Sequence, residues 1–183
     1  MGRRLALVSD QGDQSEQTTH AAETLRWTFR PLGWGDALAV SRWRYPGPYA
    51  QENMSLLATT SVAFVHPILN ALGLASFYVV ADERRQRVGI FSYIKRRDAI
   101  EIGLGLRPDL VGQGRNLGLA FVEAGLAYGR TRYAPARFML LVGAYNLRAQ
   151  RVYERAGFTP VRTVTRAGEH GTSEFIEMVR DEK

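Results

Sequence analysis

The first part of the chain has no pattern of apolar positions from which a helix or a strand could be built. Residues 10–19 read DQGDQSEQTT and contain no apolar side chain. A segment that buries no apolar surface cannot offset the conformational entropy that folding removes. We therefore expect a disordered N-terminal tail at residues 1–23 and one folded domain at residues 24–183.

The beginning of the folded domain carries one strand signal followed by helical signals. Apolar residues alternate with polar ones over residues 24–31, which is typical of a half-buried strand. A helix capped by its first residue, an aspartate, is expected at 36–43, and a Pro-Gly-Pro break follows at 46–48. We expect a second helix at 51–57 and a further helical segment at 66–74.

Three consecutive apolar runs in the middle of the chain have the character of strands. They are rich in β-branched and aromatic residues, and short charged connections separate them. The runs occupy 75–81, 88–94 and 99–106. Connections this short predict an antiparallel meander.

The last part of the domain alternates helix and strand signals. Helices are expected at 117–129 and 146–156, the second with an asparagine as N-cap and Gly157 as terminator. A continuous apolar run at 137–144 predicts a central strand covered on both faces. A final pair of strands is expected at 158–165 and 173–179. We find no repeat and no internal linker, so the order of elements predicts one α+β domain.

Composition excludes several classes of chemistry. The chain has 183 residues with 45% hydrophobic and 23% charged residues, which suits a single globular domain. It contains no cysteine, so disulfides, thiolate metal sites and cysteine nucleophiles are excluded. The three histidines, at positions 20, 66 and 170, are too scattered to predict a metal site.

The chain is basic, with a formal net charge of +6 and a pI near 10, so its surface attracts anions. The basic clusters at 84–87 and 95–97 flank predicted strands and lack interleaved aromatic residues, so we expect solvated turns and not a nucleic-acid partner. No apolar run is long enough for a membrane span or a secretory signal. We therefore expect a cytoplasmic protein with no membrane partner.

A glycine-rich segment at 101–118 is the first candidate for chemistry. Gly112, Gly114 and Gly118 precede or open a predicted helix, where unpaired backbone N–H groups can receive phosphate oxygens. In the preceding strand, Gly103 and Gly105 share one face, so a ligand could lie directly against the backbone. The alternative is a glycine-rich turn that only lets a helix pack on the sheet.

Two nucleotide-binding motifs fail at this loop. A P-loop requires Lys followed by Ser or Thr after its last glycine, but Leu119 and Ala120 follow Gly118. A dinucleotide fingerprint requires a tight strand-to-helix turn and an acidic residue at the end of the next strand. Here the connection is about seven residues long and the next strand ends in Gly-Ala-Tyr, so hydride chemistry is not expected.

Two segments resemble the acyl-CoA-binding signatures of the GNAT superfamily of N-acetyltransferases. Residues 107–118 read RPDLVGQGRNLG and are similar to its pyrophosphate loop, Q/R-x-x-G-x-G/A. Residues 146–158 read NLRAQRVYERAGF and are similar to N-x-x-A-x-x-x-Y-x-x-x-G-F. The pair in this order is more specific than either part, and the resemblance extends over 24–180. It implies a GNAT-type fold, a mixed and mostly antiparallel twisted sheet flanked by helices.

The resemblance also implies a set of acetyl-CoA-binding residues. Strand backbone would bind the pantetheine arm, the loop would hold the pyrophosphate, and the helix of the second signature would contact the cofactor near its sulfur. The implied residues are Leu104, Gly105, Leu106, Val111, Gly112, Gln113, Gly114, Arg115, Asn116, Asn146, Ala149 and Tyr153. Val111 and Asn116 depart from the usual motif, which leaves open a weakened or purely sensory site. Asn146 as a simple N-cap and Tyr153 as a core residue are the alternatives.

The resulting hypothesis is an enzyme that moves an acetyl group from acetyl-CoA to a small-molecule or protein amine, with no metal. Since there is no cysteine, direct transfer in a ternary complex is expected. Tyr153 is the candidate general acid, and Glu101 is the candidate base, with a solvated strand residue as its alternative. A non-catalytic acyl-CoA-binding regulatory domain and a basic RNA-associated protein remain the rival functions. A homodimer is left open.

Overall fold

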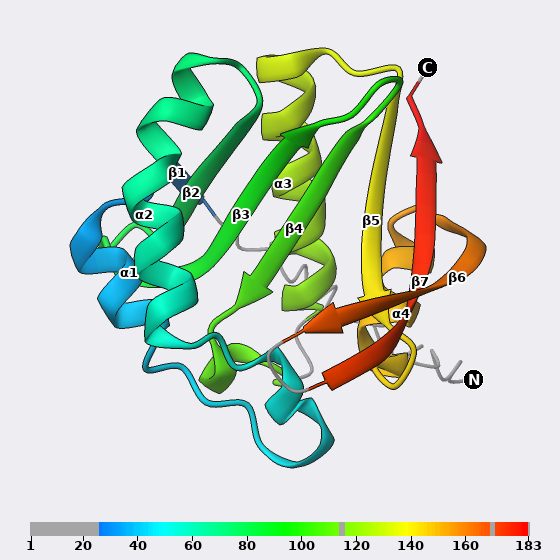
Figure 1. Ribbon diagram of the computed structural model, residues 1–183, viewed down its shortest axis with the longest axis horizontal. Coiled ribbons are helices and arrows are strands. Elements are labelled where there is room, and N and C mark those ends of the chain that lie inside the picture. The colour runs from blue at the N-terminus through cyan, green and yellow to red at the C-terminus, as the bar shows by residue number, and fades with distance from the viewer. Residues whose placement is uncertain (1–25, 114–115, 169–170, 183) are drawn as a thin grey trace, which may run out of the picture.

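The computed structural model describes residues 26–113, 116–168 and 171–182, and in these residues one mixed sheet is covered by helices on both faces (Figure 1). Its strands, in the spatial order β1-β2-β3-β4-β5-β7-β6, are β1 (Thr28–Pro31), β2 (Ala75–Ala81), β3 (Arg87–Lys95), β4 (Ile100–Leu106), β5 (Arg137–Gly143), β6 (Thr159–Gly168) and β7 (Gly171–Asp181). The helices are α1 (Trp34–Val40), α2 (Leu56–Ala71), α3 (Leu117–Tyr133) and α4 (Leu147–Arg155), with short 3-10 helices at Gly47–Glu52 (η1) and Pro108–Leu110 (η2). The predicted α+β class is confirmed.

The sheet is antiparallel except where β4 meets β5. β2 to β4 form the expected meander, β1 adds to the free side of β2, and β5 lies inside the sheet between β4 and β7 as predicted. The parallel β4–β5 ladder contains only the pairs Ile100↔Phe138 and Glu101↔Met139. Beyond these pairs the two strands diverge (Figure 1). The divergence opens the middle of the sheet.

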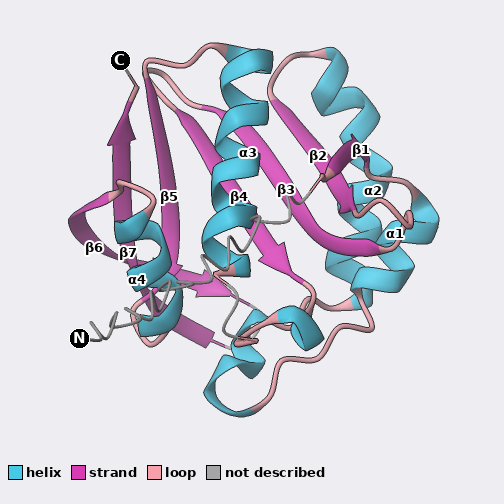
Figure 2. Cartoon of the chain, turned by 180° about the vertical axis from the view of Figure 1, so that it is seen from behind, coloured by secondary structure: helices cyan, strands magenta, loops and turns pink. Residues whose placement is uncertain are grey.

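The two faces of the sheet are covered by different helices. α1 and α2 lie on one face, and α3 lies on the other with α4 beside it, as the view from behind shows (Figure 2). The α3 face contains the aromatic core, in which Phe91, Tyr93, Phe121 and Phe138 are each at most 1% exposed. Burial of these rings is the main source of stability for the pairing of α3 with the sheet.

The predicted end of α3 at Gly129 is wrong, because the helix continues to Tyr133. Gly129 lies over the core, where a Cβ atom would be 2.9 Å from the rings of Phe138 and Tyr93. This glycine therefore permits close packing and does not terminate the helix. The actual C-cap is Ala134, in the left-handed conformation with φ 41°.

The first predicted helix has different bounds. α1 is capped by Gly33 and ends at Val40, so it begins before residue 36 and stops short of residue 43. Asp36 lies in its first turn, where its carboxylate accepts hydrogen bonds from Gly33 N–H, from both Nη atoms of Arg30 and from Nε of Arg87. Burial acts to raise the pKa of Asp36, but these donors outweigh it and lower the pKa to about 2.

α2 is one continuous helix where two separate segments were expected. Ser55 caps it through a hydrogen bond from Ala58 N–H to Oγ at 3.1 Å, and the helix runs to Ala71 with Pro67 inside it. Residues 47–52 form a 3-10 helix, so the predicted boundaries at 51–57 and 66–74 are wrong. Two features explain the single helix: Ser55 caps its first turn, and the apolar pattern continues without a break through Pro67.

The C-terminal elements agree with the prediction in type; α4 and β5 are slightly shorter than predicted, and the last two strands are longer. Asn146 caps α4, since its Oδ1 accepts the N–H of Ala149 at 3.2 Å, and Gly157 follows the helix with φ +86°. β6 and β7 form a hairpin that continues to residues 168 and 171. The predicted tail at 1–23 lies outside the described residues.

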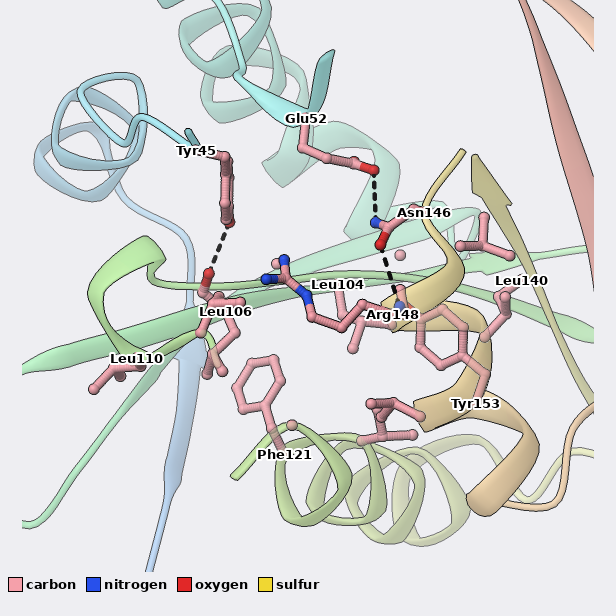
Figure 3. A pocket seen from close by; sticks show the side chains of 18 of the residues that line it. Tyr45, Glu52, Leu104, Leu106, Leu110, Phe121, Leu140, Asn146, Arg148 and Tyr153 are labelled. Atoms are coloured by element: carbon pink, nitrogen blue, oxygen red, sulfur yellow. Dashed lines mark hydrogen bonds between the residues drawn. The ribbon is translucent and has the colours of Figure 1, made fainter. Parts of the chain in front are cut away.

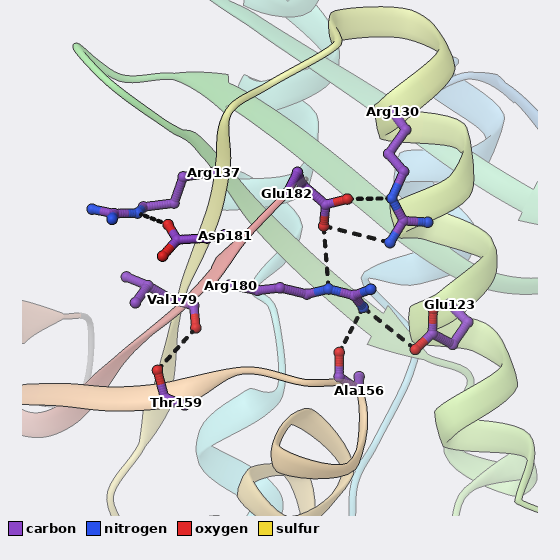
Figure 4. Close-up of polar contacts among 9 residues, drawn as sticks. All are labelled: Glu123, Arg130, Arg137, Ala156, Thr159, Val179, Arg180, Asp181 and Glu182. Carbon is purple, nitrogen blue, oxygen red and sulfur yellow. Dashed lines mark hydrogen bonds and ion pairs between the residues drawn. The ribbon is translucent and has the colours of Figure 1, made fainter.

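A polar cluster at the end of β7 holds α4 in place (Figure 4). Arg180 donates to the carbonyl of Ala156, the C-cap of α4, at 2.6 Å, and it pairs with Glu123 of α3 and with Glu182. Glu182 also pairs with Arg130. A cation on the last carbonyl of a helix satisfies an open acceptor and complements the helix dipole. The cluster therefore joins α3, α4 and β7 at the end of the sheet where β4 and β5 are still paired.

Candidate functional site

A cavity of about 440 Å³ lies where β4 and β5 diverge. Its walls are formed by β4, β5, the loop after β4, the first turns of α3, α4, and residues from the segment between α1 and α2 (Figure 3). The volume is within the ~300–1,000 Å³ range of small-molecule sites. One cavity is thus lined by residues from both sequence signatures and by residues from the segment between α1 and α2.

Most of the predicted cofactor residues line this cavity. They are Leu104, Gly105, Leu106, Val111, Gly112, Gln113, Asn116, Asn146, Ala149 and Tyr153. Gly114 and Arg115 lie outside the described residues. The structure therefore brings both signatures to one cavity, although their binding roles remain predictions.

The loop end of the cavity is suited to an anion. The chain passes through Gly112 in the left-handed conformation, φ +81°, and through Asn116, φ 52°, before α3 begins. The first residues of α3 line the cavity, so the positive end of a 17-residue helix faces it. Gln113 donates to the carbonyl of Asp109 and so braces the loop itself. Two arginines among the described residues line the cavity, and the sequence reasoning missed both: Arg155 donates to Asn116 Oδ1 at 3.2 Å, and the Arg148 guanidinium lies 4.1 Å from the centroid of the Tyr49 ring.

At the other end of the cavity, the wall is formed by the backbone of β4. From Ile102 onward, the β5-facing edge of β4 has no strand partner among the described residues. Tyr45 donates its hydroxyl to the carbonyl of Leu106 at 2.7 Å and forms part of the wall. Burial, with a smaller contribution from Glu52, raises the pKa of Tyr45 to about 12. An extended ligand could therefore pair with the free edge, as an added strand does.

Tyr153 projects from α4 into the same cavity. Its ring packs against Phe158 at a centroid distance of 6.2 Å. Among the described residues, no group hydrogen bonds its hydroxyl. Burial, followed by the charges of Glu52 and Tyr45, raises the pKa of Tyr153 above its ordinary value. The hydroxyl therefore keeps its proton at neutral pH and is available as a donor.

Glu52 is the carboxylate of the cavity wall, and no other Asp or Glu among the described residues lines it. It ends η1, and its Oε1 accepts from the Tyr145 hydroxyl at 2.9 Å and from Asn146 Nδ2 at 3.0 Å (Figure 3). Asn146 thus caps α4 with its oxygen and holds Glu52 with its nitrogen. No sequence signal pointed to Glu52, because it lies in a segment without a recognisable motif.

Glu101, the predicted base, does not line the cavity. Its side chain is 12% exposed and pairs with Arg96 at 2.6 Å. Its catalytic role stays a prediction, and its position beside Arg96 does not favour that role.

The described residues contain no group of three or more His, Asp or Glu side chains arranged to bind a metal ion. His66 is buried beside the ring of Phe77, and burial lowers its pKa. His20 and His170 lie outside the described residues. Within the described part of the chain, no helix combines the length and the apolar character that crossing a membrane requires.

Comparisons with solved structures agree on the fold. A chimera of the spermidine N-acetyltransferase SpeG from Vibrio cholerae and hSSAT has a TM-score of 0.69 and 17% identity, covering 85% of this chain and 95% of that one. The Vibrio cholerae spermidine N-acetyltransferase in complex with CoA and spermine has a TM-score of 0.63 at 17% identity, with 84% and 94% covered. RimL, a ribosomal L7/L12 alpha-N-protein acetyltransferase in complex with coenzyme A, has a TM-score of 0.65 at 18% identity, with 85% and 93% covered.

Comparison with protein families is more decisive. A search of curated proteins finds no match. The model of the acetyltransferase (GNAT) domain, however, matches residues 17–159, which is most of the chain. The match includes the glycine-rich loop and the whole of the second signature, so the family predicted from these two motifs is confirmed. This chain belongs to the GNAT acetyltransferase family.

Proposed function

We propose that this chain transfers an acetyl group from acetyl-CoA to a primary amine by direct reaction in a ternary complex. One observation carries the proposal. The free edge of β4, the N-terminus of α3 and the Tyr153 hydroxyl all face one cavity of about 440 Å³. These are the three features that a phosphorylated thioester donor requires: anion recognition, a backbone guide and a proton donor.

The acyl donor fits the cavity in one direction. The pyrophosphate lies at residues 111–116, against the N-terminus of α3 and near Arg155. The pantetheine arm follows the free edge of β4 at residues 104–106, opposite Asn146 and Ala149 on α4. Val111 and Asn116 depart from the usual motif, but recognition here depends mainly on backbone N–H groups. The thioester then reaches the part of the cavity that contains Tyr153.

The reaction is the exchange of a C–S bond for a C–N bond. The neutral amine attacks the thioester carbonyl, the C–N bond forms, and the nitrogen gives up a proton. Glu52 is the acceptor of that proton, directly or through a water molecule, since it is the carboxylate of the cavity wall. The C–S bond breaks, and the leaving thiolate takes the proton of the Tyr153 hydroxyl. Backbone N–H groups of β4 stabilise the oxyanion.

The acceptor is a small-molecule or protein amine. The fold neighbours are named for spermidine and for a ribosomal protein, which are very different amines, so the likeness does not select between them. The acceptor is selected instead by the segment between α1 and α2, which contributes Trp43, Tyr45, Glu52 and Met54 to the cavity wall. A homodimer stays a prediction.

Ligand-induced stabilisation and product formation test the proposal together. Acetyl-CoA should raise the Tm, whereas ATP and NAD at equal concentration should not, because the loop lacks the P-loop Lys and the dinucleotide carboxylate. Free thiol should then appear only when a primary amine is added. Stabilisation without transfer to any amine would instead indicate a non-catalytic acyl-CoA-binding domain, and no stabilisation would refute the cofactor site.

A further inference from the structure

A second, smaller chamber continues the main cavity on the α1 and α2 side of the sheet. Its volume is about 220 Å³, below the ~300–1,000 Å³ of sites for drug-sized ligands. It lies between α1, α2 and strands β2 to β4. Both spaces are bordered by the same five residues, Val40, Met54, Ile90, Gly103 and Leu104. The two spaces are therefore adjacent parts of one site.

The lining of the chamber is apolar. Residues such as Val62, Phe77 and Ile90 form its walls, and none of the described residues that line it carries a charge. Hydroxyl groups line it from Thr59 and Ser92, whereas the Tyr78 ring points to the α3 side of the sheet, where its hydroxyl contacts that of Tyr133 at 3.3 Å. Thr59 donates to the carbonyl of Ser55 at 3.0 Å, and Ser92 donates to the carbonyl of Gly103 at 3.5 Å.

Gly103 marks the junction of the two spaces. It is exposed although it lies in the middle of the sheet, and it faces the α1 and α2 side with Ser92 opposite it. A Cβ atom at this position would lie 2.6 Å from Ser92 Oγ. β4 therefore has no side chain at the point where a molecule held in the chamber would enter the main cavity.

We infer that the acceptor is a primary monoamine carried on an apolar chain or ring, with its apolar body in this chamber and its nitrogen at the junction. The inference rests on the proposed acetyl transfer. A body in the chamber directs the nitrogen past Gly103 toward the thioester, Glu52 and Tyr153. The uncharged lining suits an apolar body, because a charged group without a partner in the chamber would carry a large desolvation cost.

Charge argues against a polycationic acceptor. A diamine or polyamine that delivers one nitrogen to the thioester would leave a second ammonium in the chamber, where no described carboxylate lines the wall. The chain also has a net charge of +6, which repels polycations at long range. Glu52, the carboxylate of the main cavity, does not line the chamber and so cannot pair with an ammonium held there.

The test compares acceptors that differ only in the second charge. Thiol release from acetyl-CoA is measured with hexylamine and with hexamethylenediamine, and spermidine and phenethylamine extend the series. We expect kcat/KM for hexylamine to exceed that for hexamethylenediamine by at least about tenfold. An equal or higher value for the diamine or for spermidine would overturn the inference and leave the acetyl transfer standing.

Two substitutions in the chamber and one outside it locate the effect. Val62→Phe fills the chamber and should lower kcat/KM for phenethylamine by at least about tenfold. Val62→Ala enlarges it and should raise the preference for phenethylamine over hexylamine. Val65→Phe makes the same change on α2 at a position 39% exposed, and it should alter neither value by more than about twofold.

The outcomes separate this inference from the proposed function. Stabilisation by acetyl-CoA, measured for every variant, reports that the protein is folded and that the donor site is intact. If it is retained while both Val62 variants keep the wild-type preference, the acceptor does not use the chamber and the inference is wrong. If the wild-type protein neither binds acetyl-CoA nor acetylates any amine, the proposed function itself fails.

Discussion

Replacing Tyr153 by Phe removes one hydroxyl from the cavity and leaves the rest of the side chain in place. The ring should keep its contact with Phe158, at a centroid distance of 6.2 Å. No described group loses a hydrogen-bond partner, so the free energy of unfolding should change by less than about 0.5 kcal/mol. A large change in activity would therefore report on chemistry and not on folding.

The expected loss in turnover follows from the role of the hydroxyl. General acid assistance contributes typically ~10²–10⁴-fold, and a thiolate is a moderately good leaving group, so we expect kcat to fall by at least about tenfold. A tenfold loss corresponds to about 1.4 kcal/mol in the activation free energy. KM for acetyl-CoA should change little, because the hydroxyl acts mainly as charge develops on sulfur. Since the pKa of Tyr153 is raised, alkaline pH should not remove the wild-type donor before the amine is fully neutral.

The assay is the initial rate of thiol release at saturating acetyl-CoA and amine, together with a urea denaturation curve for each protein. Tyr133→Phe is the control for loss of a hydroxyl outside the cavity; it also removes the 3.3 Å contact with the Tyr78 hydroxyl, so its denaturation curve shows how large a purely structural effect can be. A Tyr153→Phe enzyme with wild-type kcat, under conditions where the chemical step limits the rate, would refute the reasoning. Tyr153 would then be a wall residue only.

Three further predictions concern separate parts of the molecule. Glu52→Gln should keep the protein folded, since the amide oxygen can accept the same two hydrogen bonds, and should lower kcat by at least about tenfold in the thiol assay. Asp36→Asn should lower the free energy of unfolding by about 2 kcal/mol at neutral pH, as measured by urea denaturation. Because the folded pKa of Asp36 is lowered to about 2, the wild type should lose this stability as the pH falls from about 4 toward 2, and the variant should lack that slope. Gly129→Ala should destabilise by ~1–3 kcal/mol through a clash with the Phe138 ring, whereas Gly35→Ala, with no atom within 4 Å of its Cβ, should not destabilise; equal melting points would contradict this packing.

Local signals predicted the part of the site that is built from consecutive residues. The glycine-rich loop and the second signature each lie within about a dozen residues, so their order and spacing were sufficient to predict the family, and most of the residues predicted from them line one cavity. Asn146 was predicted as an N-cap and is one, because capping depends on a short backbone pattern.

The remaining features depend on contacts between distant segments. Glu52 meets Tyr145 and Asn146 only because η1 packs over the start of α4, and Tyr45 reaches Leu106 across 61 positions. Glu52 belongs to no motif. Gly129 resembled a helix terminator in the sequence, but its actual role is set by rings from two strands. The apolar chamber likewise depends on how α1 and α2 lie on the sheet.

Initial-rate kinetics over a matrix of acetyl-CoA and hexylamine concentrations test the central claim most directly. The account predicts thiol release that requires the amine, equal amounts of thiol and acetylated amine, and double-reciprocal lines that intersect, because both substrates must be bound before transfer. Thiol release that is independent of the amine, or parallel lines indicating an acetylated enzyme intermediate, would contradict direct transfer in this cavity.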